Sequence, residues 1–167
     1  MTEFPNVPDI RREKETLMSV NGPSGGTGGN SQDTDSDEGF LELGTRVVRV
    51  LLSFDDNNHH AVEGIQFTHL RNNGSLLDLP HHGGFGGSQT LFDLDRNEHI
   101  VKISGRYKKF VTSATVETDT ARAISVGTGG DGDGEYTYEA RPGFEIVGFF
   151  GRSGTLVDAI GVALRAR

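Results

Sequence analysis

Three glycine-rich clusters divide the sequence into stretches of similar length. Gly25–Gly29 and Gly83–Gly87 share the pattern Gly-Gly-x-Gly-Gly, and Gly127–Gly130 is a weaker copy of it. These first, second and third glycine clusters lie roughly 45–60 residues apart, and short apolar runs follow each of them. Such a spacing predicts a threefold internal repeat, in which every unit combines one glycine loop with several strands.

The composition restricts both the fold class and the partners. Glycine accounts for 24 of 167 residues, and no long periodic helical segment follows residue 20, so we expect one all-β domain with tight turns. The net charge of −8 argues against nucleic acid and anionic membranes as main partners. The sequence contains no cysteine and no apolar stretch of membrane-spanning length, and its first residues lead us to expect no signal peptide. We therefore expect a cytoplasmic or non-classically released protein without membrane insertion.

Runs of β-branched and aromatic residues predict strands along most of the chain. Thr45–Phe54 and Ala61–Leu70 are typical of a hairpin, and the turn sequence Arg71–Gly74 ends it. Further strands are expected at residues 90–94, 98–105, 111–118, 123–126, 136–138 and 144–150.

The C-terminal part of the chain contains the best candidate for a binding loop. Phe144–Phe150 and Val162–Leu164 are apolar enough to form buried strands, and the polar, glycine-rich stretch Gly151–Gly161 joins them. Glycine allows a backbone to approach a ligand closely, and the Asp158 carboxylate can accept hydrogen bonds from two hydroxyl groups.

This stretch resembles the C-terminal motif of the jacalin-related lectins, in which a glycine precedes the sugar-binding aspartate. The motif here is Gly154-Thr155-Leu156-Val157-Asp158. Gly22–Gly29 also resembles the Gly-Pro-Trp-Gly-Gly-x-Gly-Gly opening of these domains, with Ser24 in place of the aromatic residue. The resemblance implies a β-prism I fold, with three four-stranded antiparallel sheets in pseudo-threefold symmetry. It assigns residues 18–167 to the lectin domain and leaves residues 1–17 as an N-terminal extension.

The resemblance also implies a carbohydrate site shared by two loops. The Asp158 carboxylate would accept hydrogen bonds from two adjacent sugar hydroxyls, in the turn that Gly154 opens. The N–H groups of Thr155, Leu156 and Gly29 would donate to other sugar oxygens. Because Thr155 and Leu156 are not aromatic and the chain is unbroken through the first glycine cluster, we expect mannose or glucose glycans. A galactose-binding lectin is the alternative.

Some mannose-binding relatives have a second site in the next repeat. Its residues would be Gly87, Ala61 and Glu63, although glutamate is longer than aspartate and His59 occupies the position of the motif glycine. The corresponding loop of the third repeat, Lys108–Val111, carries no acid, and we expect no site there.

Three further patterns have simpler interpretations. Asp33–Gly39 lacks the glycine and glutamate that a calcium loop requires, so we interpret it as a solvated acidic loop. The histidine pairs at 59–60 and 81–82 lack a third ligand and are interpreted as exposed loop residues. No metal or cofactor is therefore predicted. Asn73–Ser75 matches the glycosylation acceptor pattern, but no secretion signal accompanies it.

Three classes of function remain to be compared. Glycosidases need two carboxylates across one bond, and Asp158 has no acidic companion in its loop, so we expect no enzyme. A β-prism that has lost sugar binding and acts as a protein-interaction module is the main alternative to a lectin. A single shallow sugar site with a Kd near 1 mM corresponds to about −4 kcal/mol. We therefore expect a homo-oligomer that presents several sites to glycans or glycoproteins.

Overall fold

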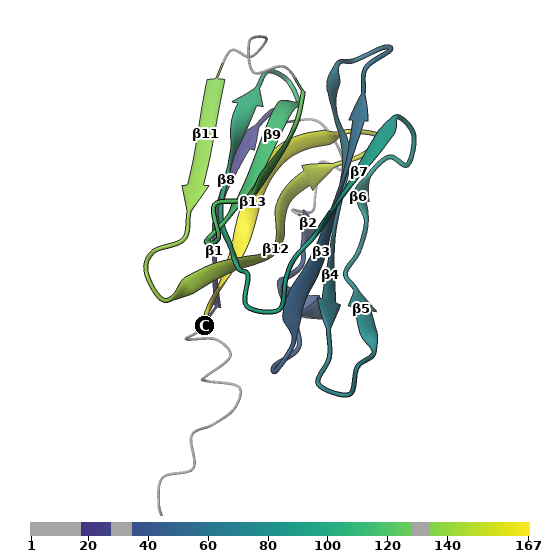
Figure 1. Cartoon of the computed structure of the whole chain (residues 1–167). Coiled ribbons are helices and arrows are strands. Elements are labelled where there is room, and N and C mark those ends of the chain that lie inside the picture. Colours follow the sequence, from purple (N-terminus) through teal and green to yellow (C-terminus); the bar gives the residue numbers. More distant parts are fainter. Residues whose placement is uncertain (1–17, 28–34, 128–133) are drawn as a thin grey trace, which may run out of the picture.

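The computed structural model describes residues 18–27, 35–127 and 134–167, which form three antiparallel sheets around a common interior (Figure 1). The all-β prediction is confirmed. The one helix among the described residues is the short 3-10 helix η1 (Glu38–Phe40). Within these residues, no helix is long and apolar enough to cross a membrane.

Each sheet is built on one long hairpin with outer strands on both sides. Sheet 1 has the spatial order β1 (Met18–Gly25), β13 (Val157–Ala166), β12 (Phe144–Ser153) and β2 (Asp35–Ser36). Sheet 2 has the order β5 (Leu76–Asp78), β4 (Ala61–Leu70), β3 (Arg46–Asp55) and β7 (Ser88–Asp93), and β6 (His82–Gly83) also pairs with β4. Sheet 3 has the order β10 (Ala123–Val126), β9 (Val111–Thr118), β8 (Ile100–Tyr107) and β11 (Gly134–Glu139).

Sheet 2 departs from the expected four strands because its outer strand is split. Both β5 and β6 pair with β4, and the segment between them contains Pro80. Proline has no N–H group for a strand ladder, which explains why the pairing is interrupted there.

The predicted threefold repeat is visible in the backbone of the glycine clusters. Gly25 and Gly83 are the last residues of β1 and β6, Gly127 follows β10, and their φ angles are 139°, 93° and 84°. A Cβ atom on any of them would clash with a carbonyl oxygen of the neighbouring inner strand, at Asp158, Glu63 and Thr112 respectively. Both the positive φ and the close approach require glycine. These three residues of the inner strands therefore occupy equivalent positions in the three sheets.

The inner faces of the three hairpins share a single apolar core. Its fully buried side chains are mostly β-branched or aromatic and come from all three sheets, which is what alternating strand patterns produce when one face is covered. They include Val50, Leu52, Ile65, Phe67, Ile103, Val116, Ile146, Phe149 and Ile160.

The acidic stretch after the first glycine cluster is not the solvated loop that the sequence suggested. Asp35 and Ser36 form β2, and Asp37 is completely buried. The Asp37 carboxylate accepts a hydrogen bond of 2.7 Å from the Phe149 N–H group and lies 2.6 Å from Nε2 of His82. Because a buried carboxylate is stable only with such partners, this contact fixes β2 against sheets 1 and 2.

The interpretation of residues 81 and 82 as exposed histidines is also wrong. His82 is buried, and its ring stacks on Phe149 at a centroid distance of 4.4 Å. His81 is half-buried, and its Nε2 lies 2.7 Å from the Gly84 carbonyl oxygen. Both rings therefore stabilise the start of the second glycine cluster. His59 and His60 are exposed, as expected.

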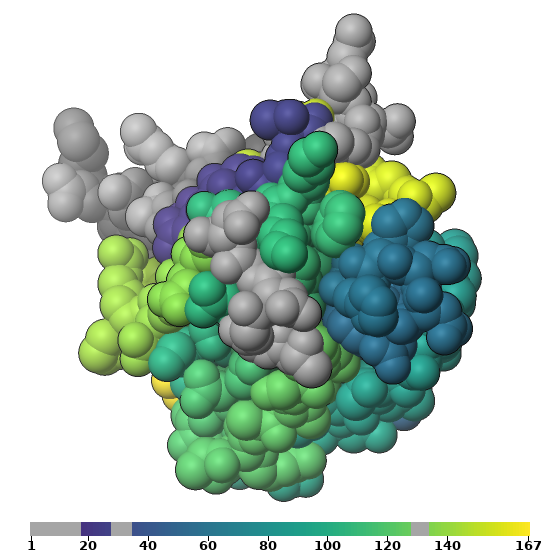
Figure 2. Space-filling view, turned by 90° about the horizontal axis from the view of Figure 1, so that it is seen from above, coloured from purple at the N-terminus to yellow at the C-terminus, as the bar shows by residue number. Residues whose placement is uncertain are grey.

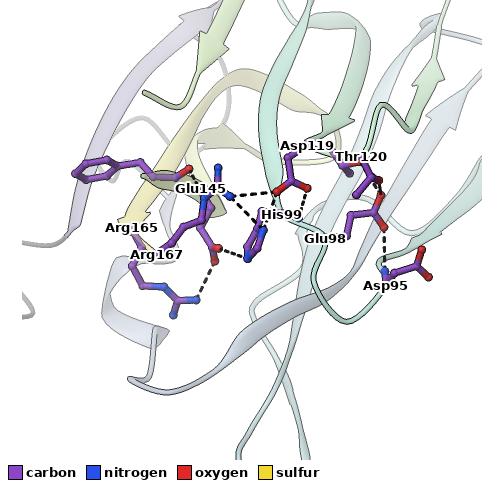
Figure 3. A network of polar contacts seen from close by, with 10 residues as sticks. Asp95, Glu98, His99, Asp119, Thr120, Glu145, Arg165 and Arg167 are labelled. Atoms are coloured by element: carbon purple, nitrogen blue, oxygen red, sulfur yellow. Dashed lines mark hydrogen bonds and ion pairs between the residues drawn. The ribbon is translucent and has the colours of Figure 1, made fainter. Parts of the chain in front are cut away.

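The opposite end of the prism is held by a network of charged side chains (Figure 3). Glu145 lies 3.0 Å from Arg165 and 3.6 Å from His99, and His99 lies 2.9 Å from Asp119. Arg167 also contacts Asp119, at 3.1 Å. These contacts join the ends of β12 and β13 to the loops of sheet 3, far along the strands from the glycine clusters.

We predict that Asp37→Ala destabilises the protein by about 3–5 kcal/mol, because it leaves the Phe149 N–H group and the His82 ring buried without their partner. Urea unfolding followed by circular dichroism would measure the change. Asp56→Ala is the matched control, since the Asp56 side chain is 79% exposed, and should cost less than about 0.5 kcal/mol. Equal effects of the two changes would contradict the structural role of Asp37.

A second prediction concerns His69, which is fully buried and lies 2.7 Å from the Val147 carbonyl oxygen. Burial lowers the pKa of His69, although the hydrogen bond to Val147 partly opposes this. In the unfolded chain His69 is protonated at about pH 6.5, whereas in the folded protein it is protonated only at a lower pH. The contribution of His69 to the free energy of unfolding is therefore fully present above about pH 6.5 and decreases as the pH falls below that value.

The loss attributable to His69 is at most about 1.4 kcal/mol per pH unit. It would be measured as the difference in unfolding free energy between the parent and His69→Gln, which should narrow as the pH falls from about 7.5 to about 5.5. A difference that stays constant over this range would show that His69 is not the group involved.

Candidate functional site

The predicted binding loop is shorter than the sequence suggested. β12 continues to Ser153 and β13 begins at Val157, so only residues 154–156 lie outside the strands. The Gly154 N–H group donates to the Leu156 carbonyl oxygen at 2.9 Å and closes the turn. The ladder extends this far because Val157 is buried and pairs with Ser153. Asp158 is therefore the second residue of a strand, which holds its backbone firmly.

Two N–H groups of this turn are available to a ligand. Within the part of the chain that the structure describes, the N–H groups of Thr155 and Leu156 have no acceptor. Thr155 is exposed and Leu156 is half-buried, so neither group is shut inside the protein. The family resemblance implied this pair of donors, and the structure shows that both belong to the turn that precedes Asp158 in the β12–β13 hairpin.

The Asp158 carboxylate is half-buried, and among the described residues no group outside Asp158 donates a hydrogen bond to it. Burial raises its pKa, and the nearby Arg152 guanidinium and the residue's own N–H group partly oppose this shift. A half-buried carboxylate without a donor retains unused acceptor capacity. Together with the two free N–H groups, it can receive a molecule that carries both hydroxyl donors and oxygen acceptors.

The first glycine cluster borders Asp158, as expected. β1 ends at Gly25, and the Gly26 N–H group donates to the Asp158 carbonyl oxygen at 2.9 Å. The Arg152 guanidinium donates to the Thr27 carbonyl oxygen, also at 2.9 Å. Figure 2 looks onto this end of the molecule, where the purple end of β1 lies beside the yellow β12–β13 hairpin. Gly29 lies outside the described residues, so its role stays a prediction.

The second repeat brings Gly87 and Glu63 together but uses the carboxylate differently. The Gly86 N–H group donates to Glu63 Oε1 at 3.2 Å, and the Gly84 N–H group donates to the Glu63 carbonyl oxygen at 2.8 Å. A Cβ atom on Gly87 would approach Glu63 Oε2 to 2.7 Å. Ala61 is completely buried. The longer glutamate side chain therefore lies against its own glycine cluster and accepts a hydrogen bond from it.

The third repeat has Thr112 at the position of the acid. The sequence comparison placed this loop at Lys108–Val111 and did not identify Thr112. Its hydroxyl is buried and has no hydrogen-bond partner among the described residues. The sequence contained a pattern that could have identified Thr112. A valine precedes the equivalent residue in each of the three repeats, at Val157, Val62 and Val111, and all three valines are fully buried in the structure.

An aromatic pair at the second glycine cluster was also missed. Phe85 is 73% exposed and stacks on His81 with a centroid distance of 4.0 Å. The adjacent Gly84 packs against the Thr155 carbonyl oxygen, so this pair lies beside the turn of the β12–β13 hairpin. A phenylalanine inside a glycine cluster was the signal that could have identified it. Among the described residues, no group of three His, Cys, Asp or Glu side chains could hold a metal ion.

Comparisons with known proteins agree with this fold. The sequence profile of the Jacalin-like lectin domain matches residues 21–163. Horcolin from Hordeum vulgare is 29% identical over 144 residues, which cover 84% of this chain and 92% of horcolin. Myrosinase-binding protein 2 from Arabidopsis thaliana is 30% identical over 141 residues, which cover 83% of this chain and 19% of that protein.

A solved structure shows the same architecture. The mannose-binding lectin from champedak superposes with a TM-score of 0.70 at 26% sequence identity, covering 89% of this chain and 97% of that lectin. The profile match spans most of the chain, and the superposition reproduces the three-sheet prism. The chain therefore belongs to the jacalin-related lectin family.

Proposed function

We propose that this protein is a non-catalytic lectin that binds mannose- or glucose-type glycans at Asp158. The observation that carries the proposal is the half-buried Asp158 carboxylate, which receives no hydrogen bond from any other described residue. Beside it, the N–H groups of Thr155 and Leu156 have no acceptor among the same residues. Membership of a lectin family supports carbohydrate binding, and the champedak relative is described as mannose binding.

The chemistry of the site suits a sugar with two adjacent hydroxyl groups. Both hydroxyls would donate to the Asp158 carboxylate, and hydrogen bonds to an ionised acceptor are about twice as strong as neutral ones. The Thr155 and Leu156 N–H groups would donate to the ring oxygen or to further hydroxyls. Because β13 fixes Asp158 and the turn fixes the two N–H groups, little ordering would be needed on binding.

We prefer mannose or glucose to galactose because of the residues that border Asp158. Thr155 and Leu156 offer no aromatic face on which a galactose ring could stack. β1 is also continuous from Met18 to Gly25, so the chain runs into the first glycine cluster without a break. A galactose-binding site remains the alternative within the same fold.

We propose one working site in each chain. Glu63 already accepts a hydrogen bond from Gly86, so a sugar at the second repeat would have to displace that contact. A single shallow site with a Kd near 1 mM is worth only about 4 kcal/mol, and useful affinity would require several copies acting together. A homo-oligomer would supply them.

A protein-interaction module is the second candidate. It is favoured by the similarity to a protein named for binding myrosinase and by the exposed ring of Phe85 beside the site. Exposed aromatic side chains are common anchors in protein interfaces. This candidate predicts a folded protein that binds no glycan, even in a multivalent format.

We predict that Asp158→Asn abolishes binding to mannose- and glucose-terminated glycans or weakens it at least tenfold. The amide keeps the size of the side chain but removes its charge and one of its two acceptors. A glycan array followed by calorimetric titration with methyl α-mannoside would measure the loss.

Glu63→Gln is the matched control for this experiment, since it removes the equivalent charge from the second repeat. Glycan binding that survives in Asp158→Asn and disappears in Glu63→Gln would move the site to the second repeat. A parent protein that is folded and binds no glycan would favour the interaction module.

The raised pKa of Asp158 predicts how binding depends on pH. Since the ionised carboxylate is the acceptor, affinity should fall on acidification, with a midpoint above the ordinary aspartate value of about 3.9. Titration with methyl α-mannoside between about pH 7 and about pH 4 would locate the midpoint, and circular dichroism would confirm that the protein stays folded. Affinity that is flat over this range would exclude an ionised Asp158 from binding.

A further inference from the structure

Two lysines from the third repeat border the Asp158 site. Lys108 and Lys109 are exposed at the tip of the β8–β9 hairpin, where the Lys108 N–H group donates to the Phe110 carbonyl oxygen at 2.8 Å. Gly26 connects this tip to the site, because its N–H group binds the Asp158 carbonyl oxygen while its Cα packs directly on the Lys109 carbonyl group. A Cβ atom at Gly26 would overlap Lys109, so the two loops cannot separate or slide apart without losing this contact.

A single residue, Gly26, lies between Lys109 and the Asp158 hairpin and contacts both. In Figure 2, purple atoms of β1, green atoms of sheet 3 and yellow atoms of the β12–β13 hairpin gather at this end of the molecule. Both Lys109 and Asp158 contact Gly26 through their carbonyl groups, so the lysine tip and the Asp158 hairpin meet at this residue. Lysine carries its ammonium group on a flexible four-carbon stem, which can extend toward a ligand held at Asp158.

The charges of Lys108 and Lys109 have no acidic partner in the described part of the chain. Lys102, in contrast, lies 3.6 Å from Glu117. The protein as a whole carries a net charge of −8, so two adjacent unpaired lysines are unusual on its surface. Near the same site, the Arg152 guanidinium donates to the Thr27 carbonyl oxygen, so it adds a further positive charge.

We propose that Lys108 and Lys109 select glycans that carry an anionic group on the sugar residue next to the one held at Asp158. This inference rests on the proposed lectin function of Asp158. The anion belongs on the neighbouring residue because the Asp158 carboxylate repels a negative charge placed directly against it. Phosphate, sulfate and uronic acid carboxylate share the required chemistry, and the compact charge of lysine on a flexible stem suits all three.

The expected gain is modest and depends on salt. Two unit charges 4 Å apart in water attract by about 1 kcal/mol, and exposed charges are screened over about 8–10 Å at physiological ionic strength. We therefore expect an affinity for the charged glycan about three- to tenfold above that for its neutral counterpart in low salt. The ratio should approach one in about 1 M salt.

The test compares three probes by calorimetric or NMR titration of the full chain. The neutral probe is mannobiose, and the charged probes are the same disaccharide with a phosphate or with a uronic acid at the residue distal to Asp158. The parent is compared with the double substitution Lys108→Gln and Lys109→Gln. Lys102→Gln is the matched control, since it removes one charge from the other end of β8. The measured quantity is the ratio of affinities for charged and neutral probes.

The proposal predicts a ratio above about three in the parent and in Lys102→Gln, and a ratio near one in the double variant. A preference for only one charged probe would identify which anion the site takes. If the parent binds mannobiose but gains nothing from either charge, the lysine proposal is wrong and the lectin function stands. If the parent binds none of the probes, both fail. A preference that survives in the double variant would assign the selectivity to other cations.

Discussion

The absence of a Cβ atom at three backbone crossings is the constraint on which this structure depends. Gly25, Gly83 and Gly127 each lie at positive φ and pass directly over a carbonyl group of an inner strand. Any larger residue would move the crossing chain away from the hairpin and separate the outer strands from the sheet. The same close approach brings the first glycine cluster against Asp158, so the geometry of the candidate site is a consequence of how the prism closes.

Two aspartates near this end show how burial and partners decide the use of a carboxylate. Asp37 is completely buried and is satisfied by Phe149 and His82, so it links the end of β2 to β12 and β6. Asp158 is half-buried with no donor from another residue in the described part of the chain, and its pKa is raised because burial disfavours the charge. The first arrangement stabilises the fold, and the second leaves acceptor capacity for a ligand.

The three repeats have kept one backbone while their chemistry has diverged. At the equivalent positions, the Asp158 carboxylate receives no hydrogen bond from another described residue, and the Glu63 carboxylate accepts one from a glycine cluster. The Thr112 hydroxyl is buried and has no partner among the described residues. One added methylene in Glu63 is enough to let the carboxylate reach the Gly86 N–H group. A pseudo-symmetric fold therefore need not contain three equivalent sites. The third repeat contributes differently, since its lysine tip borders the site of the first.

The sequence alone determined the repeat, most of the longer strands and the Asp158 hairpin, because glycine spacing, residue alternation and a contiguous motif are local patterns. It did not predict the short strands β2, β5 and β6. It could not determine the burial of Asp37, whose partners His82 and Phe149 lie 45 and 112 residues away in the chain. The sequence also could not show that Glu63 accepts a hydrogen bond from Gly86, or that Lys109 and Asp158 both contact Gly26. Each of these depends on side chains and backbone from different sheets meeting at one end of the prism. Local sequence patterns do not specify contacts between residues that are far apart in the chain, so only the tertiary structure decided them.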